Sequence, residues 1–308
     1  MAGWRLGRTQ VIGVVAALVA VVALVWGGTV LFGSDGGGKK GTAGDAGADP
    51  AATDPAAGDQ PSAPADGSGG LPRIYIAGDS TAATYVPKFA PRTGWGEALP
   101  VFLNHDKVSV NNWAKVGASS KSFVDEGRLA KILAEIRKGD YLLIGFGHND
   151  ERPEPIVHTD PFGSYQDYLR KFVDGARSKG AVPVLVTPAE RYHFDQAGRI
   201  APSHGEYPAA MRQVATEDKV PLVDLTTLST ALWNAHGPQG ALNDFLSLAP
   251  GESPNYPKGV QDKTHFKTHG AIELAQLVAK RLYAEHVLPA EDFQGLERTD
   301  VPDSALAG

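Results

Sequence analysis

Four short stretches of the chain carry side chains that could together perform acyl-transfer chemistry. They are GDST at 78–81, GASS at 117–120, GHND at 147–150 and DKTH at 262–265. They supply a hydroxyl, a glycine-flanked turn, a carboxamide and an Asp-x-x-His pair. A serine hydroxyl becomes an effective nucleophile when a base takes its proton, and histidine can do so near neutral pH. The four stretches therefore predict a serine nucleophile, a general base and hydrogen-bond donors for an oxyanion.

Each role in this chemistry has one candidate residue. Ser80 is the predicted nucleophile, His265 its base, and Asp262 the group that fixes the tautomer of His265 and stabilises the imidazolium. A tetrahedral intermediate needs hydrogen-bond donors directed at its oxyanion. The N–H groups of Ser80 and Gly117 and the amide of Asn149 could supply three. We expect glycine at 117 because a Cβ there would hinder the close approach of the backbone to the oxyanion.

Several neighbours of these residues have simpler expected roles. Asp79 is expected to stabilise a turn or cap a helix. Trp95, between two glycines, is expected to pack in the core or at the rim rather than to form a sugar platform. His148 and Asp150 are expected to be surface residues that shape a loop.

Three further residues are candidates for contact with a substrate. They are Lys121, His193 and His204. His193, His204 and His269 also fit a structural or solvated role, which is the usual one for a histidine taken alone.

The elements that must position these residues follow from hydrophobic periodicity. Apolar runs predict strands at 73–77, 108–114, 141–146, 182–187 and 220–225. Helical spacing predicts helices at about 129–136, 165–176 and 270–286. Strands that alternate with helices in this way indicate one parallel sheet covered on both faces. Ligands of such sheets bind beyond the carboxyl ends of the strands, where three of the four chemical stretches lie.

The N-terminal 70 residues have a different composition from the remainder. Residues 11–32 carry no charge and would span roughly 33 Å as a helix, enough to cross a bilayer. Arg5 and Arg8 precede this run, so residues 1–10 are expected to be cytoplasmic and the rest exported. A cleaved signal peptide, with secretion, is the alternative. Residues 33–70 are expected to be a disordered Gly/Ala/Asp/Pro linker, and residues 71–308 the single catalytic domain.

Composition excludes several other classes of function. The chain of 308 residues has no cysteine, which rules out disulfides, thiolate metal sites and a cysteine nucleophile. Its net charge of −6 argues against nucleic acid as a partner. The expected partners are an acetylated polysaccharide as substrate and the membrane through residues 11–32; no cofactor and no metal are expected.

The stretches IYIAGDSTAATY, VGASSKSFVDEGR, GDYLLIGFGHND and DKTHF resemble the SGNH (GDSL-type) hydrolase superfamily, and specifically the rhamnogalacturonan acetylesterases. The similarity covers roughly residues 73–283. It implies a metal-free three-layer α/β/α sandwich with a five-stranded parallel sheet, similar to flavodoxin. It also implies that Ser80, Asp262 and His265 form the triad and that Ser80, Gly117 and Asn149 form the oxyanion hole. Members of this group remove acetyl groups from pectic rhamnogalacturonan.

The second stretch departs from the pattern of this family. Relatives often carry Gly-Arg-Ser-Ser/Thr-Arg there, whereas this chain has Ala118 and Lys121 in place of the two arginines. Arginine binds a carboxylate through two parallel hydrogen bonds, while lysine offers a point charge. This departure weakens the expectation that the substrate is an anionic galacturonate polymer. It leaves the catalytic prediction unchanged.

The function predicted from the sequence is an extracytoplasmic serine esterase that deacetylates a polysaccharide through an acetyl-serine intermediate. One alternative is an SGNH esterase or lipase acting on another acyl ester. A second is a metal-dependent phosphoesterase built on the acidic and histidine residues Asp79, His148, Asp150, Asp262 and His265. A third is a glycan-binding protein without catalysis.

Overall fold

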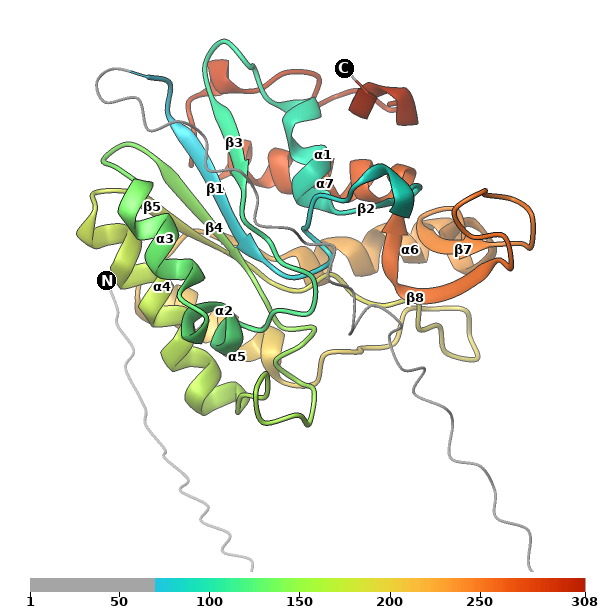
Figure 1. The fold of residues 1–308 in the computed structure, drawn as a ribbon, viewed down its shortest axis with the longest axis horizontal. Coiled ribbons are helices and arrows are strands. Elements are labelled where there is room, and N and C mark those ends of the chain that lie inside the picture. Colours follow the sequence, from blue (N-terminus) through green and yellow to red (C-terminus); the bar gives the residue numbers. More distant parts are fainter. Residues whose placement is uncertain (1–69, 308) are drawn as a thin grey trace, which may run out of the picture. The chain divides into compact units, whose positions relative to one another are not determined.

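The computed structural model describes residues 70–307 (Figure 1). The predicted cytoplasmic segment 1–10, the membrane-spanning segment 11–32 and the linker up to residue 69 lie outside the described residues. Within residues 70–307, every helix is either too short or too polar to cross a membrane.

A five-stranded parallel sheet forms the centre of the described chain. Its strand order is β3-β1-β4-β5-β6, and each neighbouring pair runs parallel. The strands are β1 (Arg73–Gly78), β3 (Ser109–Asn112), β4 (Tyr141–Gly145), β5 (Val182–Val186) and β6 (Leu222–Val223). The prediction of five parallel strands is confirmed. The strands predicted at 108–114 and 220–225 are shorter in the structure, where they are β3 and β6, because the backbone leaves the hydrogen-bonded ladder after Asn112 and Val223.

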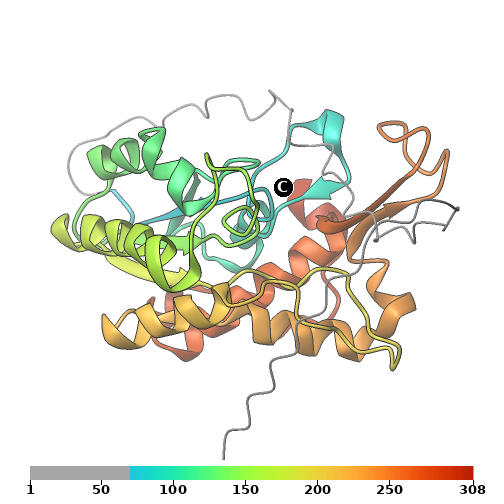
Figure 2. The ribbon, with the colours of Figure 1, turned by 90° about the horizontal axis from the view of Figure 1, so that it is seen from below.

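Alternate residues of the strands build two separate cores, one on each face of the sheet. Ile74, Ile76 and Leu143 pack on one face against helices α1 (Trp95–Ala98), α6 (Leu225–Ala241) and α7 (Thr268–Ala284). Tyr75 and Leu142 lie on the other face with helices α2 (Ser120–Asp125), α3 (Arg128–Glu135), α4 (Gln166–Ser178) and α5 (Tyr207–Glu217). Successive side chains of a strand point to opposite faces, so the continuous apolar runs are explained by helices on both sides. Figure 2 shows α3 and α4 on one side of the sheet and α7 on the other.

The helices agree in part with the sequence periodicity. They are α1 (Trp95–Ala98), α2 (Ser120–Asp125), α3 (Arg128–Glu135), α4 (Gln166–Ser178), α5 (Tyr207–Glu217), α6 (Leu225–Ala241) and α7 (Thr268–Ala284). The helices predicted near residues 129, 165 and 270 are α3, α4 and α7. Helices α5 and α6 were not predicted. A kink interrupts α6, where Gly237 has a left-handed φ of 67° and Pro238 follows.

A second, three-stranded sheet was also not predicted. It consists of β2 (Arg92–Thr93), β8 (Val260–Lys267) and β7 (Phe245–Leu248), paired antiparallel in the order β2-β8-β7. The pairing of β7 with β8 is irregular: Phe245 lies opposite Phe266, whereas Ser247 lies opposite Gln261. Residues 262–265 of β8 therefore form a bulge, and bulges reorient side chains locally.

The strand order also defines where a ligand would bind. The chain moves from β1 outward to β3 and then returns to β4 on the other side of β1. Such a reversal leaves a crevice beyond the carboxyl ends of the two central strands. Ser80 follows β1 and Asn149 follows β4, so both lie at this reversal.

Candidate active site

The structure brings Ser80, His265 and Asp262 together in one chain of hydrogen bonds. The Oγ atom of Ser80 lies 2.8 Å from Nε2 of His265. On the other side of the ring, Nδ1 of His265 lies 2.7 Å from Oδ2 of Asp262. A carboxylate can only accept, so Nδ1 carries the hydrogen and Nε2 is free to accept the proton of the serine hydroxyl. This is the orientation that a general base requires.

The bulge in β8 holds Asp262 against His265. Oδ1 of Asp262 accepts hydrogen bonds from the backbone N–H of Thr264 at 2.8 Å and of His265 at 2.9 Å. These bonds fold the bulge tightly and leave Oδ2 for the imidazole. Burial by itself would raise the pKa of Asp262, but the hydrogen bonds and charge of His265 hold it well below its usual value. Asp262 therefore stays ionised beside the ring.

The three predicted donors belong to the segments that follow β1, β3 and β4. Among the described residues, no protein acceptor takes a hydrogen bond from the backbone N–H of Ser80 or of Gly117. Asn149 is buried, and its Nδ2 donates to the carbonyl of Ala118 at 2.9 Å, which leaves a second N–H on the same amide. The arrangement has the donors that an oxyanion requires.

Gly117 meets a backbone requirement in addition to the predicted close approach to the oxyanion, which stays a prediction. No heavy atom of the protein lies within 4 Å of the position that a Cβ would occupy there, so crowding by the protein does not exclude a side chain. Instead, Gly117 has a φ of 76°, in the left-handed region that glycine adopts without strain. The constraint at this position is the turn conformation.

Asp150 is fully buried, so the expectation that it is a surface residue was wrong. It accepts hydrogen bonds from the backbone N–H and the Oγ of Ser120, at 3.1 Å and 2.5 Å, and from Oγ1 of Thr159 at 3.1 Å. Asp150 thereby joins the loop that carries Gly117 to the loop that carries Asn149. Burial raises the pKa of Asp150 to about 7 despite these hydrogen bonds.

His148 is also buried, at 4% exposure, and the same correction applies to it. Its ring packs edge-on against the ring of His204, with centroids 4.4 Å apart. Neither ring nitrogen of His148 has a hydrogen-bond partner among the described residues. Burial, reinforced by the nearby charges of His204 and Arg191, lowers its pKa well below the usual value. His148 is therefore a neutral imidazole beside the crevice.

The loop that follows Ser80 is held from several directions. Oδ1 of Asp79 accepts from the backbone N–H and the hydroxyl of Thr81, so the predicted turn role of Asp79 is confirmed. The hydroxyl of Tyr85 donates to the carbonyl of Ser80 at 2.7 Å. Trp95 is buried and its backbone N–H donates to the carbonyl of Thr81, which confirms the packing role expected for Trp95. The backbone around Ser80 is thus fixed before any substrate arrives.

The three predicted substrate contacts differ in their surroundings. Lys121 lies 3.2 Å from Asp125 one helical turn further on, so its charge is partly balanced. His193 is exposed, on a loop that hydrogen-bonds through Tyr192 to the carbonyl of Lys263. His204 is only 1% exposed, and its Nε2 donates to the carbonyl of Ala189 at 2.8 Å. A buried, hydrogen-bonded ring offers a polymer no contact surface, so the structure does not support that prediction for His204.

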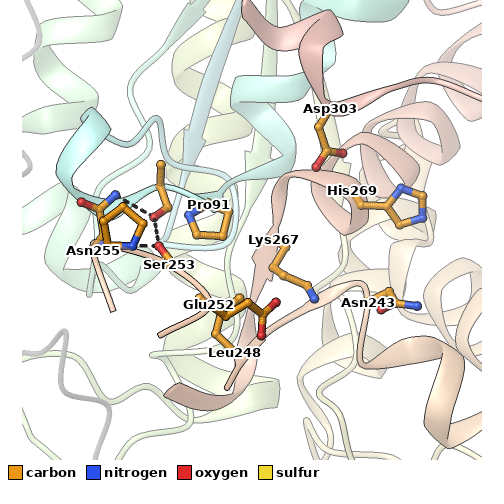
Figure 3. A pocket seen from close by; sticks show the side chains of 11 residues that line it. Pro91, Asn243, Leu248, Glu252, Ser253, Asn255, Lys267, His269 and Asp303 are labelled. Carbon is orange, nitrogen blue, oxygen red and sulfur yellow. Dashed lines mark hydrogen bonds between the residues drawn. The ribbon is translucent and has the colours of Figure 1, made fainter. Parts of the chain in front are cut away.

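A cavity of about 540 Å³ is lined in part by Pro91, Ser253 and Asp303. Its lining includes Lys267, His269 and Asn255, but none of the three residues of the hydrogen-bonded triad (Figure 3). The site of the chemistry is therefore identified by its hydrogen bonds rather than by the volume of a pocket.

The ligand set of the alternative phosphoesterase does not assemble. Oδ1 of Asp79 and both carboxylate oxygens of Asp150 accept hydrogen bonds from hydroxyl and amide donors of the protein. Within residues 70–307, the group of three or more His or carboxylate residues whose ligand atoms all lie within 4.8 Å of one another is His236, Asp244 and Glu273, which are not residues of that set. The side chains of the crevice therefore suit nucleophilic catalysis by a serine.

Comparison with known proteins agrees with this geometry. Residues 76–271 match the GDSL-like Lipase/Acylhydrolase family. The rhamnogalacturonan acetylesterase RhgT of Bacillus subtilis (strain 168) is 46% identical over 220 residues, which cover 71% of this chain and 93% of that protein. The probable rhamnogalacturonan acetylesterase YesY of the same organism is 39% identical, over 67% of this chain and 90% of that protein.

A solved structure supports the fold. The crystal structure of the YxiM protein of Bacillus subtilis superposes with a TM-score of 0.62 at 29% sequence identity. The superposition covers 71% of this chain and 58% of that one. The similarity therefore concerns the described sheet and its helices.

The buried Asp150 should make stability depend on pH. Between about pH 4 and pH 7, the folded chain retains a proton on Asp150 that the unfolded chain has released. Stability should therefore fall as the pH rises through this range, by an amount on the order of a few kcal/mol. In urea titrations at successive pH values, Asp150→Asn should lose this slope while the exposed control Asp167→Asn retains it. Equal slopes in the two variants would contradict the assignment.

Proposed function

The chain belongs to the GDSL-like lipase/acylhydrolase family, and on this basis we propose that it is a serine esterase that removes O-acetyl groups from a polysaccharide. Within the family it is a carboxylic ester hydrolase of the rhamnogalacturonan acetylesterase-like group. The observation that carries the proposal is the 2.8 Å contact between Oγ of Ser80 and Nε2 of His265, because it couples a nucleophile directly to its base.

In the first half of the proposed reaction, the acetyl group moves to the enzyme. Oγ of Ser80 attacks the acetyl carbonyl carbon while its proton passes to Nε2 of His265. The carbonyl oxygen becomes an oxyanion, which the N–H groups of Ser80, Gly117 and Asn149 stabilise. When the carbonyl reforms, the bond to the sugar oxygen breaks. The imidazolium donates its proton to that oxygen, and the free sugar hydroxyl leaves.

In the second half, water takes the place of the sugar. It gives a proton to Nε2 of His265 and attacks the acetyl carbon, which again forms an oxyanion. The bond to Oγ of Ser80 then breaks, Oγ recovers the proton, and acetate is released. Asp262 stays ionised throughout, since its low pKa keeps it a carboxylate beside the imidazolium.

The proposed substrate is an acetylated rhamnogalacturonan-like polymer. The support is the 46% identity to RhgT, whose name states this activity, over nearly the whole of that protein. Lys121 and the exposed His193 are the proposed polar contacts at the rim. Because Lys121 is paired with Asp125, we expect recognition of acidic sugars to be weaker than an arginine would provide.

The proposed location is the cell membrane, with the catalytic domain outside the cytoplasm. The support is the uncharged run of residues 11–32 behind Arg5 and Arg8, which has the length and flanking charge of a membrane anchor. Secretion after cleavage is the alternative.

Ser80 should react covalently with an organophosphorus serine-hydrolase probe, because its hydroxyl is activated by His265. Ser80→Ala should abolish both labelling and the release of acetate from acetylated glycans, including acetylated rhamnogalacturonan and acetylated xylan. Peptide mass spectrometry locates the adduct. An adduct on Ser119 or Ser120, or none, would refute the assignment. Normal labelling without turnover on any acetylated glycan would favour another acyl ester or a binding role.

Asn149→Ala should lower kcat by about 10²–10³-fold with little change in KM, because the interaction forms mainly in the transition state. The matched control is Gln166→Ala, which also removes a buried amide that donates to a backbone carbonyl, that of Ala210 at 3.0 Å. Both variants should lower Tm, but the control should retain its kcat per folded molecule. Near-normal kcat in Asn149→Ala would remove Asn149 from the oxyanion hole.

The native chain should fractionate with membranes, and protease added to intact cells should digest its folded part. Deleting residues 11–32 should leave the folded protein in the cytoplasm, because the segment that directs export is gone. Recovery of the native protein from the medium with a new N-terminus between residues 28 and 50 would instead indicate cleavage.

A further inference from the structure

The turn that carries Asn149 packs against the segment that connects β5 to α5. We call residues 147–151 the oxyanion turn and residues 187–206 the β5–α5 segment. Arg191 and His204 of the segment both contact the oxyanion turn directly. The mechanism proposed above assigns no task to either side chain.

The guanidinium of Arg191 contacts four groups at once. Its Nη1 donates to the carbonyl of Ser203 at 2.8 Å and lies 3.2 Å from Nδ1 of His204. Its Nη2 forms an ion pair with Oε1 of Glu151 and donates to the carbonyl of His148 at 3.4 Å. The first two groups belong to the β5–α5 segment and the last two to the oxyanion turn. Arg191 therefore joins the turn to the segment.

Two packed histidine rings reinforce this contact. Nε2 of His204 donates to the carbonyl of Ala189 at 2.8 Å, and a ring with its hydrogen on Nε2 can accept from Arg191 at Nδ1. The same ring packs edge-on against that of His148, with centroids 4.4 Å apart. Both rings are buried, and His148 directly precedes Asn149. Because buried side chains are closely packed, the ring contact limits movement of the backbone that carries the amide.

The other side of Asn149 is held as well. The hydroxyl of Tyr207, the first residue of α5, lies within hydrogen-bond distance of the carbonyls of Asp150 and Thr159, at 2.9 Å from the former. Glu151 follows Asp150 directly and is paired with the guanidinium described above. The residues on both sides of Asn149 are therefore fixed by the β5–α5 segment and the helix that follows it.

The β5–α5 segment also contacts the bulge that carries the catalytic base. The backbone N–H of Tyr192 donates to the carbonyl of Lys263 at 2.8 Å. Lys263 lies between Asp262 and His265 in β8. Because Tyr192 directly follows Arg191, two neighbouring residues contact the oxyanion turn and the bulge of the base. The segment thereby relates the positions of the two parts of the active site.

The contacts of Arg191 matter more for geometry than for stability. The side chains of Arg191 and Glu151 are 24% and 22% exposed, and ion pairs that water reaches contribute little to the free energy of unfolding. In contrast, a displacement of about 1 Å in a catalytic group can lower a rate by about 10²-fold. Loss of Arg191 should therefore affect turnover more than unfolding.

We propose that Arg191 is a positioning residue for Asn149 in the oxyanion hole. It acts through Glu151 and the carbonyl of His148 and is assigned no contact with the reacting atoms. The inference rests on the proposed serine esterase function. The competing explanation is that Arg191 only stabilises the fold, so that its loss lowers Tm and leaves kcat per folded molecule unchanged.

The test is a double-mutant cycle with p-nitrophenyl acetate, a small ester that requires no recognition of a polymer. Arg191→Met should lower kcat by about 10–10²-fold with little change in KM, because the oxyanion forms only in the transition state. In the Asn149→Ala background the same substitution should change kcat by less than about twofold, since the donor that Arg191 positions is already absent. Normal kcat in Arg191→Met, or an equal loss in both backgrounds, would overturn the proposal.

Two further variants control the cycle. Arg170→Met removes another partly exposed arginine, which pairs with Glu217 at 2.8 Å and Asp218 at 3.0 Å, and it should retain kcat in both backgrounds. Arg191→Lys should lose less activity than Arg191→Met, because an ammonium keeps the charge beside Glu151 but lacks the planar fork. If Arg191→Met does not fold, Glu151→Gln replaces it and should show a smaller loss that also disappears in the Asn149→Ala background.

The choice of ester separates this proposal from the proposed function. Hydrolysis by Ser80→Ala is subtracted as background. If the native chain cleaves p-nitrophenyl acetate but releases no acetate from any acetylated glycan, the polysaccharide substrate is refuted while the cycle still decides the role of Arg191. If the native chain cleaves neither and Ser80 is not labelled, the serine esterase and the positioning role are both refuted.

Discussion

The hydrogen bond between Ser80 and His265 is the interaction on which the arrangement of the active site depends. It joins residues 185 positions apart in the chain, one after the first strand of the parallel sheet and the other in a bulge of the second sheet. A nucleophile and its base are useful only within hydrogen-bond distance. The two sheets and the helix α7 that follows β8 must therefore be positioned relative to one another within a fraction of an ångström.

Buried polar groups supply that precision around the crevice. Asp150 binds the loop of Ser120, Asn149 binds the carbonyl of Ala118, and the hydroxyl of Tyr85 binds the carbonyl of Ser80. The first two bonds join segments that are separate in the sequence, and the third closes the loop that follows Ser80. Because the donors and acceptors are buried, breaking one would leave a partner unsatisfied, and the loops are held in a single arrangement. Donors fixed in advance need no reorganisation when the oxyanion forms.

Residues that flank the β7–β8 pair in the sequence also hold that pair in place. Asp244 immediately precedes β7, and His269 and Glu273 follow β8 directly. The carbonyl of Asp244 is bonded to Lys267 at the end of β8. That hydrogen bond, together with the close approach of Gly270 to the same carbonyl, holds the turn before β7 against the start of α7. Stability of this hairpin and alignment of the catalytic pair are two consequences of the same packing.

The sequence alone determined the five parallel strands, because buried strands covered on both faces appear as uninterrupted apolar runs. It also predicted roles for Ser80, Gly117 and Asn149, because turns at the carboxyl ends of such strands meet at one edge, and for Asp262 and His265 from their Asp-x-x-His spacing. It did not reveal the second sheet, whose strands are short and whose bulge at 262–265 depends on pairing with β7. Nor did it reveal that His148 and Asp150 are buried or that His236 meets Glu273. Burial and proximity of polar side chains depend on which segments pack over them, and no local pattern of residues encodes that; only the tertiary structure does.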